Sequence, residues 1–289
     1  MIQRGPARIV TGPGQTLALL GPRWRHPPTP MTDTAVIMAR GLGTRLRSAE
    51  AGAHLSETAA RLADKGLKAL MPIAGKPLLQ HLCERLAAAG LRRGVLVIGP
   101  EQDELRHAAS QITALPLACA IQVTPRGTAD AVAAAAGSVA DSALVMNGDN
   151  LYPVACLRAC AAIAGGAVAG FTRAALVAGG IPADRVAKFS LLAQDSRGRM
   201  TRIIEKPTPA EQAELGPDAL VNMNLWRLTP ELMRACAEVA PSPRGELELP
   251  LAVLGAVQRG VPVQVVRSDE PVLDLTGRGD LAIVERHLR

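Results

Sequence analysis

The sequence predicts an α/β protein: a Rossmann-like, doubly wound, mostly parallel sheet with helices on both faces. Short apolar runs of strand length alternate along the chain with segments of helical spacing. These runs are apolar at nearly every position, which is typical of strands that are covered on both faces. Hydrophobic residues make up 48% of the 289 residues. That content is sufficient for a complete core and argues against a disordered chain.

The first half of the predicted sheet begins after residue 34. Its apolar strands are expected at residues 35–39, 94–99, 120–124 and 143–146. Helices are expected between them at residues 78–89, where Gly90 is the stop signal, and at 101–111 and 128–139. In open sheets of this kind, ligands bind beyond the carboxyl ends of the strands. The segments around Gly41, Pro125–Gly127 and Asp149 are expected at that edge.

The second half has a more mixed pattern. Strands are expected at residues 188–193, 202–205, 221–226 and 261–266, and helices at 230–239 and 249–258. Cys156 and Cys160 are four residues apart on a further expected helix. No repeat or linker interrupts the pattern, so residues 31–289 are interpreted as one domain, with halves at about 31–150 and 151–289. We expect no C-terminal β-helix, because no hexapeptide repeat is present.

Residues 1–30 differ from the rest of the chain. Ten of the thirty are Pro or Gly, and the segment holds Arg4, Arg8, Arg23 and Arg25 without any acid. We interpret it as a disordered extension or a start-site artefact ahead of Met31. It contributes +4 of the net charge of +6, so the body is close to neutral. Because aromatic residues are also only 2%, a nucleic-acid partner is not expected.

The five cysteines form no CxxC motif and are odd in number. Small buried thiols in a reducing compartment explain them best, so we expect a cytoplasmic protein. No apolar run reaches the length that spans a bilayer, and no membrane partner is expected.

A glycine-rich loop follows the first expected strand. It reads Ala39-Arg40-Gly41-Leu42-Gly43-Thr44-Arg45. Glycines let a backbone approach phosphate oxygens closely, and an arginine adds a bidentate donor. The loop lacks both the GK[ST] of a P-loop and the third glycine of a dinucleotide fingerprint. Taken alone, it predicts a tight turn almost as well as a phosphate site.

Two lysines, Lys68 and Lys76, stand eight residues apart around Pro72 in the segment KALMPIAGKP. A single lysine is usually a solvated surface charge. Together with Arg45, the pair indicates an anion-binding cluster.

These segments resemble those of sugar-1-phosphate nucleotidyltransferases, and the chain is closest in length and motifs to the thymidylyltransferase branch. The resemblance spans residues 34–289. Six motifs occur in the family's order: GLGTRL at 41–46, KALMPIAGKP at 68–77, GTADAV at 127–132, VMNGDN at 145–150, IEKP at 204–207 and RGELEL at 244–249, with Asp274 four residues before Arg278.

The resemblance implies an enzyme of EC 2.7.7 type. It would join an NTP to a sugar-1-phosphate or a cyclitol phosphate by Mg²⁺-assisted in-line attack, giving an NDP-sugar and pyrophosphate. It also implies a homo-oligomer. The residues implied as catalytic are Arg45, Lys68, Asp149 and Lys206, and those that bind the metal are Asp149 and Asp274. Nucleotide binding is implied for Ala39, Arg40, Gly41, Gly43, Thr44, Gln122, Pro125, Gly127 and Thr128, and sugar binding for Gly148, Glu205, Lys206, Asn224 and Glu246.

Other interpretations stay open for some of these residues. Asp149 is also a plausible helix N-cap, and Glu246 or Glu248 a plain partner of Arg244. The identity of the nucleotide base also stays open. Gln122 resembles a glutamine that recognises thymine or uracil, whereas GTADAV resembles the adenylyltransferase branch. A pyrimidine is slightly favoured. A silent NDP-sugar-binding regulator and a transferase for a non-sugar phosphate are the alternative functions.

Three features depart from the family pattern. Arg40 replaces a small residue beside the expected base, so its side chain must point away or contact the ligand. The stretch from Arg45 to Lys68 is long, and its expected helix at residues 56–63 is a candidate lid over the triphosphate. Lys188 and Asn224 replace glycines near the sugar, which suggests a substrate other than glucose-1-phosphate.

Overall fold

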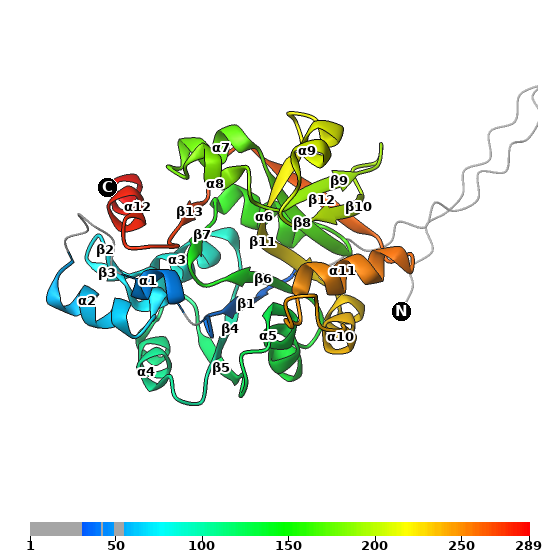
Figure 1. Ribbon diagram of the computed structural model, residues 1–289. Helices are drawn as coiled ribbons and strands as arrows, with labels where there is room; N and C mark the ends of the chain where they lie inside the picture. The colour runs from blue at the N-terminus through cyan, green and yellow to red at the C-terminus, as the bar shows by residue number, and fades with distance from the viewer. Residues whose placement is uncertain (1–30, 42, 49–54) are drawn as a thin grey trace, which may run out of the picture.

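The computed structural model describes residues 31–41, 43–48 and 55–289 (Figure 1). The predictions for residues 1–30 lie outside the described residues, as do Leu42 and residues 49–54. Within the described part, the expected Rossmann-like sheet with helices on both faces is confirmed.

The parallel half of the sheet is built around β1 (Thr34–Met38). This strand lies between β4 (Arg93–Ile98) and β6 (Ala143–Asn147), and β5 (Leu117–Ile121) follows β4 at the edge. Every β1 side chain except that of Met38 is buried, as expected for a strand covered on both faces. The carboxyl ends of all four strands therefore meet at one edge of the sheet.

Strand β11 (Leu220–Leu228) joins the two halves of the sheet. It runs antiparallel to β6 and also pairs antiparallel with β8 (Gly166–Phe171) and β9 (Leu191–Gln194). Strand β10 (Met200–Ile204) continues the sheet beyond β9, and β12 (Val263–Ser268) lies parallel to β8.

Helices cover the two faces of the sheet in two groups. The first group is α3 (Leu78–Ala89), α4 (Asp103–Gln111) and α6 (Val154–Ala162), and its buried side chains share one core cluster with Ala35 and Ile37 of β1. The second group is α5 (Thr128–Ala135), α10 (Pro230–Glu238) and α11 (Leu249–Gln258), which pack with Val36 in the other cluster. Because alternate β1 side chains enter opposite clusters, one strand anchors both layers.

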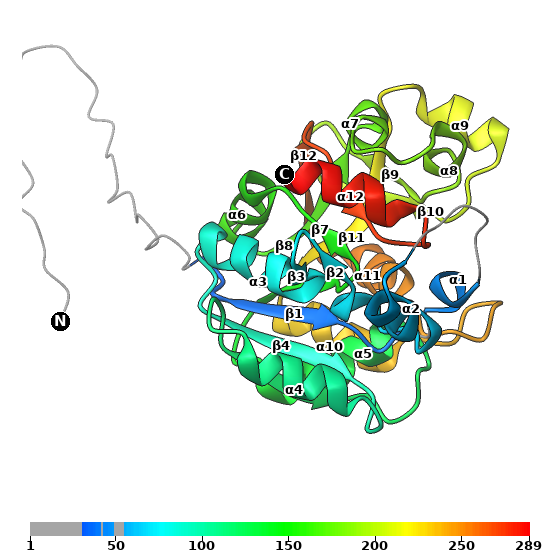
Figure 2. The ribbon, with the colours of Figure 1, turned by 90° about the vertical axis from the view of Figure 1, so that its left-hand side faces the viewer.

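Smaller elements complete the fold. Figure 2 shows α12 (Asp280–Leu288), coloured red, near the hairpin of β2 (Pro72–Ile73) and β3 (Lys76–Pro77), and α12 contacts β2. Besides α12 (Asp280–Leu288), these elements are α1 (Thr44–Arg47), α2 (Glu57–Asp64), α7 (Arg173–Ala178), α8 (Ala183–Val186), α9 (Pro209–Leu215), the short strands β2 (Pro72–Ile73), β3 (Lys76–Pro77), β7 (Asn150–Leu151) and β13 (Leu273–Asp274), and two 3-10 turns, Lys68–Leu70 and Ala136–Ser138.

Several predicted elements shift at their ends. The strand expected at 120–124 lies at 117–121, and residues 188–190 precede β9 instead of belonging to it. The helix expected at 128–139 ends at Ala135, where the chain tightens into a 3-10 turn. The helix expected at 56–63 is α2, capped by the Ser56 hydroxyl. Its apolar face packs into the core.

The five cysteines are all free thiols, and all except Cys119 are buried. Burial raises the pKa of the Cys83 and Cys236 thiols to about 12, so these two thiols stay protonated. Among the helices of the described residues, none combines the length and the apolar character that crossing a membrane requires.

Candidate active site

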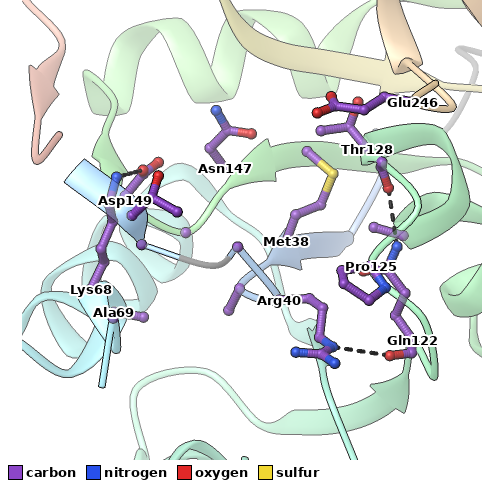
Figure 3. Close-up of a pocket in the computed structure, with 18 residues that line it drawn as sticks. Met38, Arg40, Lys68, Ala69, Gln122, Pro125, Thr128, Asn147, Asp149 and Glu246 are labelled. Carbon is purple, nitrogen blue, oxygen red and sulfur yellow. Dashed lines mark hydrogen bonds and ion pairs between the residues drawn. The ribbon is translucent and has the colours of Figure 1, made fainter. Parts of the chain in front are cut away.

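A cavity of about 500 Å³ opens where the carboxyl ends of β1, β5 and β6 meet (Figure 3). Its position agrees with the edge at which the sequence places the ligand-binding loops. Eighteen residues line it: Met38, Ala39, Arg40, Gly41, Gly43, Thr44, Gly66, Lys68, Ala69, Gln122, Pro125, Gly127, Thr128, Ala131, Asn147, Gly148, Asp149 and Glu246. All nine residues predicted to bind nucleotide are in this set.

The glycine loop forms one wall of the cavity. Gly43 has φ +60°, and a Cβ atom there would lie 2.5 Å from the Gly66 carbonyl oxygen. Only glycine combines this left-handed backbone with such a close approach. The loop is thereby held against the turn that precedes Lys68, and α1 begins directly after it at Thr44.

Arg40 folds away from the glycine loop. Its Nε donates to the Gln122 carbonyl oxygen (3.1 Å), and its Nη1 pairs with Glu101 Oε1 (2.5 Å). Only 12% of the Arg40 side chain is exposed. Figure 3 shows the guanidinium directed toward Gln122. Arg40 therefore ties the ends of β1 and β5 together.

The opposite wall joins two distant segments. The Leu247 N–H donates to the Arg126 carbonyl (2.8 Å), and the Leu247 carbonyl accepts the Ala129 N–H (2.8 Å). Gly127 lies between these bonds at φ +135°, and a Cβ atom there would be 2.4 Å from the Leu247 oxygen. The GTADAV and RGELEL segments thus form one structural unit.

Asp149 follows β6 and pairs with Lys68 in the cavity wall. Its Oδ2 lies 2.8 Å from Lys68 Nζ, and the two side chains are 25% and 19% exposed (Figure 3). The helix-cap alternative for Asp149 is wrong, because β7 follows directly and the N-cap position of the next helix, α6, is Pro153. Two residues predicted as catalytic therefore form a largely buried ion pair at the cavity.

Asp274 is brought to Asp149 by the pairing of β13 with β7. Asp274 lies opposite Asn150, and the Leu275 N–H donates to the Asp149 carbonyl (3.0 Å). Asp274 Oδ2 accepts bonds from Arg185 Nη2 (2.5 Å) and Thr276 Oγ1 (2.8 Å). Its side chain is only 8% exposed.

Burial, together with the nearby negative charge of Asp149, raises the pKa of Asp274 to about 6. The Asn150 amide fits best with its nitrogen donating to Asp274 Oδ1 (2.8 Å), which fixes the second carboxylate oxygen.

The two carboxylates are suited to a hard divalent cation. No group of three or more His, Cys, Asp or Glu that could hold a metal is present among the described residues. The chain would supply two carboxylates, and phosphate oxygens of the substrates would complete the shell, as is usual for Mg²⁺. A cation there would also relieve the repulsion that raises the pKa of Asp274.

The other predicted sugar residues, Glu205, Lys206 and Asn224, are not part of the cavity wall. The Glu205 Oε1 accepts a bond from the Ser190 hydroxyl (2.7 Å). Lys206 and Asn224 adopt the left-handed backbone conformation, with φ +48° and +56°. Non-glycine residues with such φ values are uncommon and cluster at functional sites. Asn224 lies where the pairing of β11 with β8 shifts register.

Some predicted residues lie at the surface. Arg45 is exposed on α1, one residue after Thr44, and its role stays a prediction. The Lys188 side chain is 75% exposed and reaches Asp184 at 3.5 Å, so it does not crowd the cavity. Arg244 binds both oxygens of Glu248 (3.2 and 2.8 Å), which leaves Glu246 at the cavity.

Sequence reasoning missed Arg185 and Asp280. Arg185 also pairs with Asp280 (3.0 Å), whose Oδ2 accepts the N–H groups of Thr276 and Gly277 (2.8 Å each). No motif marks Arg185, since only the packing of α8 brings it to Asp274. Asn147, which also lines the cavity, belongs to the VMNGDN motif but has no role assigned to it from the sequence.

Residues 34–270 match the family model described as nucleotidyl transferase. A UTP–glucose-1-phosphate uridylyltransferase, AglF of Haloferax volcanii, is 26% identical over 261 residues, which cover 88% of this chain and 96% of that protein. The bifunctional protein GlmU of Rhodospirillum rubrum is 28% identical over 262 residues, or 88% of this chain and 53% of GlmU. The chain thus spans about half the length of this GlmU relative.

The fold also matches a solved structure. A UDP-glucose pyrophosphorylase, crystallised with UDP-glucose, superposes with a TM-score of 0.70 over 89% of this chain and 98% of that chain. The two sequences are 17% identical, so this match concerns the fold.

Proposed function

This chain belongs to the nucleotidyl transferase family, and on that basis we propose that it transfers a nucleotidyl group from an NTP to a sugar-1-phosphate or a cyclitol phosphate. The products are an NDP-sugar and pyrophosphate. The observation that carries the proposal is the Lys68–Asp149 ion pair in the wall of the glycine-lined cavity, with Asp274 brought next to Asp149 by the pairing of β13 with β7. Acidic and basic groups at one cavity match a reaction between two anions.

In the proposed reaction, different residues bind different parts of the two anionic substrates. The backbone of the glycine loop lies against the triphosphate, and Lys68 neutralises the charge near the α-phosphate. Arg45 would stabilise the departing pyrophosphate from the adjacent α1. Lys206 and Glu205 would bind the phosphate and a hydroxyl of the acceptor. No covalent nucleophile is needed, because the acceptor phosphate oxygen itself attacks.

Mg²⁺ is part of the proposal, with Asp149 and Asp274 as its protein ligands. When bound, the ion would polarise the phosphate oxygens and offset their charge. Without the ion, Lys68 and Arg185 provide the opposite charges for these carboxylates. These two cations hold the carboxylates in place beside the cavity.

The relatives favour a uridine nucleotide, because AglF is named as a UTP-dependent enzyme. For the acceptor, glucose-1-phosphate is one candidate among sugar and cyclitol phosphates. The left-handed Asn224 adds a side chain at a bulge of β11, and this extra bulk favours an acceptor of different shape from glucose.

We further propose that the enzyme acts in the cytoplasm as a homo-oligomer. The five free thiols suit a reducing compartment. Ile121 at the end of the edge strand β5 and Val123 two residues beyond it are exposed by 38% and 73%, and a second copy would cover them. Light scattering after size exclusion tests the oligomeric state.

The first experiment is a pyrophosphate-release screen with Mg²⁺ that crosses five nucleoside triphosphates with a panel of sugar and cyclitol phosphates. We expect release that requires both substrates. In Asp149→Asn it should fall about 10²–10³-fold. Nucleotide binding without any release would support the silent-regulator alternative.

A further inference from the structure

Arg185 of α8 bridges two aspartates beside the cavity. Its Nη2 lies 2.5 Å from Asp274 Oδ2, and its Nη1 lies 3.0 Å from Asp280 Oδ1 and 3.3 Å from Asp280 Oδ2. The three side chains are mostly covered, with 24% of Arg185, 8% of Asp274 and 12% of Asp280 exposed. One guanidinium therefore neutralises two carboxylates at a place that water reaches little.

Asp280 is anchored by the backbone as well as by Arg185. Its Oδ2 accepts the N–H groups of Thr276 and Gly277, at 2.8 Å each, in the turn that leads from β13 into α12. Because these donors belong to the backbone, the position of the Asp280 carboxylate does not depend on a ligand at Asp274. Arg185 is thus held next to Asp274 by a second, fixed carboxylate.

The Arg185 side chain leaves one of its own polar atoms unsatisfied. Its Nε is buried and has no hydrogen-bond partner among the described residues. A buried donor without a partner is destabilising, so such groups are rare in folded proteins and call for an explanation. The two ion pairs supply one here, because they keep the guanidinium in place although its Nε stays unpaired.

The bonds to Asp274 leave one acceptor position free among the described residues. An ionised carboxylate has about four such positions, two at each oxygen. Asp274 Oδ2 accepts from Arg185 Nη2 and from Thr276 Oγ1 (2.8 Å). Asp274 Oδ1 accepts from the Asn150 amide in its better orientation (2.8 Å). A cation would therefore use Oδ1 alone, next to a fixed positive charge.

The other carboxylate has a counter-ion of a different kind. Asp149 pairs with Lys68, whose side chain lines the cavity and whose Nζ has no second partner in the part of the chain that the structure describes. A lysine on its flexible stem can move to a phosphate, whereas the planar fork of Arg185 is held by two carboxylates. A nucleotide would thus draw the positive charge from Asp149 but not from Asp274.

We propose that Arg185 is a positioning residue that weakens the binding of a divalent cation in the absence of nucleotide. It fixes a positive charge on Asp274, which repels a second cation and leaves the carboxylate a single coordinating oxygen. The cation is then held firmly only when triphosphate oxygens complete its shell. This inference rests on the proposed function for the location of the cation at Asp149 and Asp274.

Arg185→Gln is the decisive change, because glutamine keeps an amide donor for Asp274 but carries no charge. The probe is Mn²⁺, which takes the same oxygen ligands as Mg²⁺. We expect the affinity of the full chain for Mn²⁺, measured by calorimetry without nucleotide, to rise at least about tenfold, since an adjacent arginine changes the proton affinity of a carboxylate by about 10–10³-fold. Titration at pH 8 stays above the Asp274 pKa of about 6. Unchanged or weaker binding would overturn the inference and leave Arg185 a structural role only.

Two controls separate this effect from a change in net charge. Lys188→Met removes the same charge three residues further along the chain, from a side chain that is 75% exposed and reaches Asp184. Its Mn²⁺ affinity should stay within about twofold of the wild-type value. Arg185→Gln in an Asp274→Asn background should give no gain, because the carboxylate on which Arg185 acts is absent. A full gain in either control would contradict the role of Arg185.

Cation binding also separates this inference from the proposed reaction. If Arg185→Gln binds Mn²⁺ more tightly but the wild type releases no pyrophosphate, only the proposed function fails. If the wild type releases pyrophosphate but Arg185→Gln gives no gain, only the role of Arg185 fails. Should Arg185→Gln not fold, the same change is made in Asp280→Asn, which removes the carboxylate left without its partner. That double variant should still bind Mn²⁺ several-fold more tightly than Asp280→Asn alone, and equal affinities would refute the inference.

Discussion

The Lys68 ammonium lies 2.8 Å from the Asp149 carboxylate, although one residue belongs to a 3-10 turn before α3 and the other follows β6. Both side chains are about four-fifths covered, at 19% and 25% exposure, and both line the cavity. In the proposed reaction, this carboxylate would bind the cation and this ammonium a phosphate.

Removing either partner of this pair should stop turnover. We expect Lys68→Met to lower kcat by about 10²–10³-fold, because a charge that stabilises the reacting phosphate is lost. Steady-state pyrophosphate release measures this loss in kcat. Lys76→Met is the matched control, since Lys76 pairs with Glu84 (2.8 Å) on α3 and does not line the cavity. Equal losses in both variants would contradict the assignment.

The raised pKa of Asp274 predicts a pH-dependent stability. The carboxyl titrates near pH 6 in the folded state, whereas its unperturbed pKa is 3.8, so the folded protein binds the extra proton between these values. Its ionisation therefore costs stability as pH rises from about 4 to about 6. The full shift corresponds to about 3 kcal/mol at most.

Asp274→Asn removes that titration. The free energy of unfolding of the wild type, relative to this variant, should decline from about pH 4 to about pH 6 in chelator and then level off. Urea unfolding across this range measures the difference. A constant difference would show that Asp274 has no raised pKa. Added Mg²⁺ at about pH 7 should raise the wild-type melting temperature and have a smaller effect on the variant.

Gly127 should tolerate no side chain. Its φ is +135°, and an added Cβ atom would lie 2.4 Å from the Leu247 oxygen, so Gly127→Ala separates the two segments of the cavity wall. We expect the free energy of unfolding to fall by at least about 2 kcal/mol. Nucleotide binding should also be lost. Gly137→Ala is the control: nothing lies within 4 Å of its Cβ and its φ is ordinary, so stability should change by less than about 1 kcal/mol.

The absence of a side chain at Gly99 leaves room for the Arg40 guanidinium beside the cavity. A Cβ atom at Gly99 would lie 2.5 Å from Arg40 Cζ, so Gly99→Ala should push the guanidinium off Glu101 and into the cavity. The affinity for nucleotide should fall several-fold. Arg40→Ala in the same chain should restore it, since the displaced group is then gone. A double-mutant cycle of nucleotide affinity tests this coupling, and strict additivity would exclude it.

The sequence predicts most of the nucleotide half of the fold, because its strands are built from Val, Ile and Leu with clear glycine stops. That pattern predicts the sheet edge at which the cavity opens, whereas the nine nucleotide-binding residues between Ala39 and Thr128 come from the resemblance of the motifs to the family. Strand β8 was missed, since GAVAGF has two glycines and two alanines with low strand propensity, yet all six residues are buried between β11 and β12. Tertiary packing determines this strand.

The electrostatic partners could not be predicted in the same way. Arg185 reaches Asp274 from a four-residue helix, and Gln122 donates to Asp130 in the first turn of α5. Such contacts depend on side-chain directions after folding. Residue spacing carries no signal for them.

The pairing of β7 with β13 also has a consequence for synthesis on the ribosome. Asp149 emerges with the first half of the polypeptide, whereas Asp274 and the Leu275 N–H that binds the Asp149 carbonyl emerge much later. A nascent chain that has folded its parallel strands still lacks one of the two carboxylates. In the proposed reaction, turnover would begin only when this late segment has docked, and a truncated product would be inert even if it bound nucleotide.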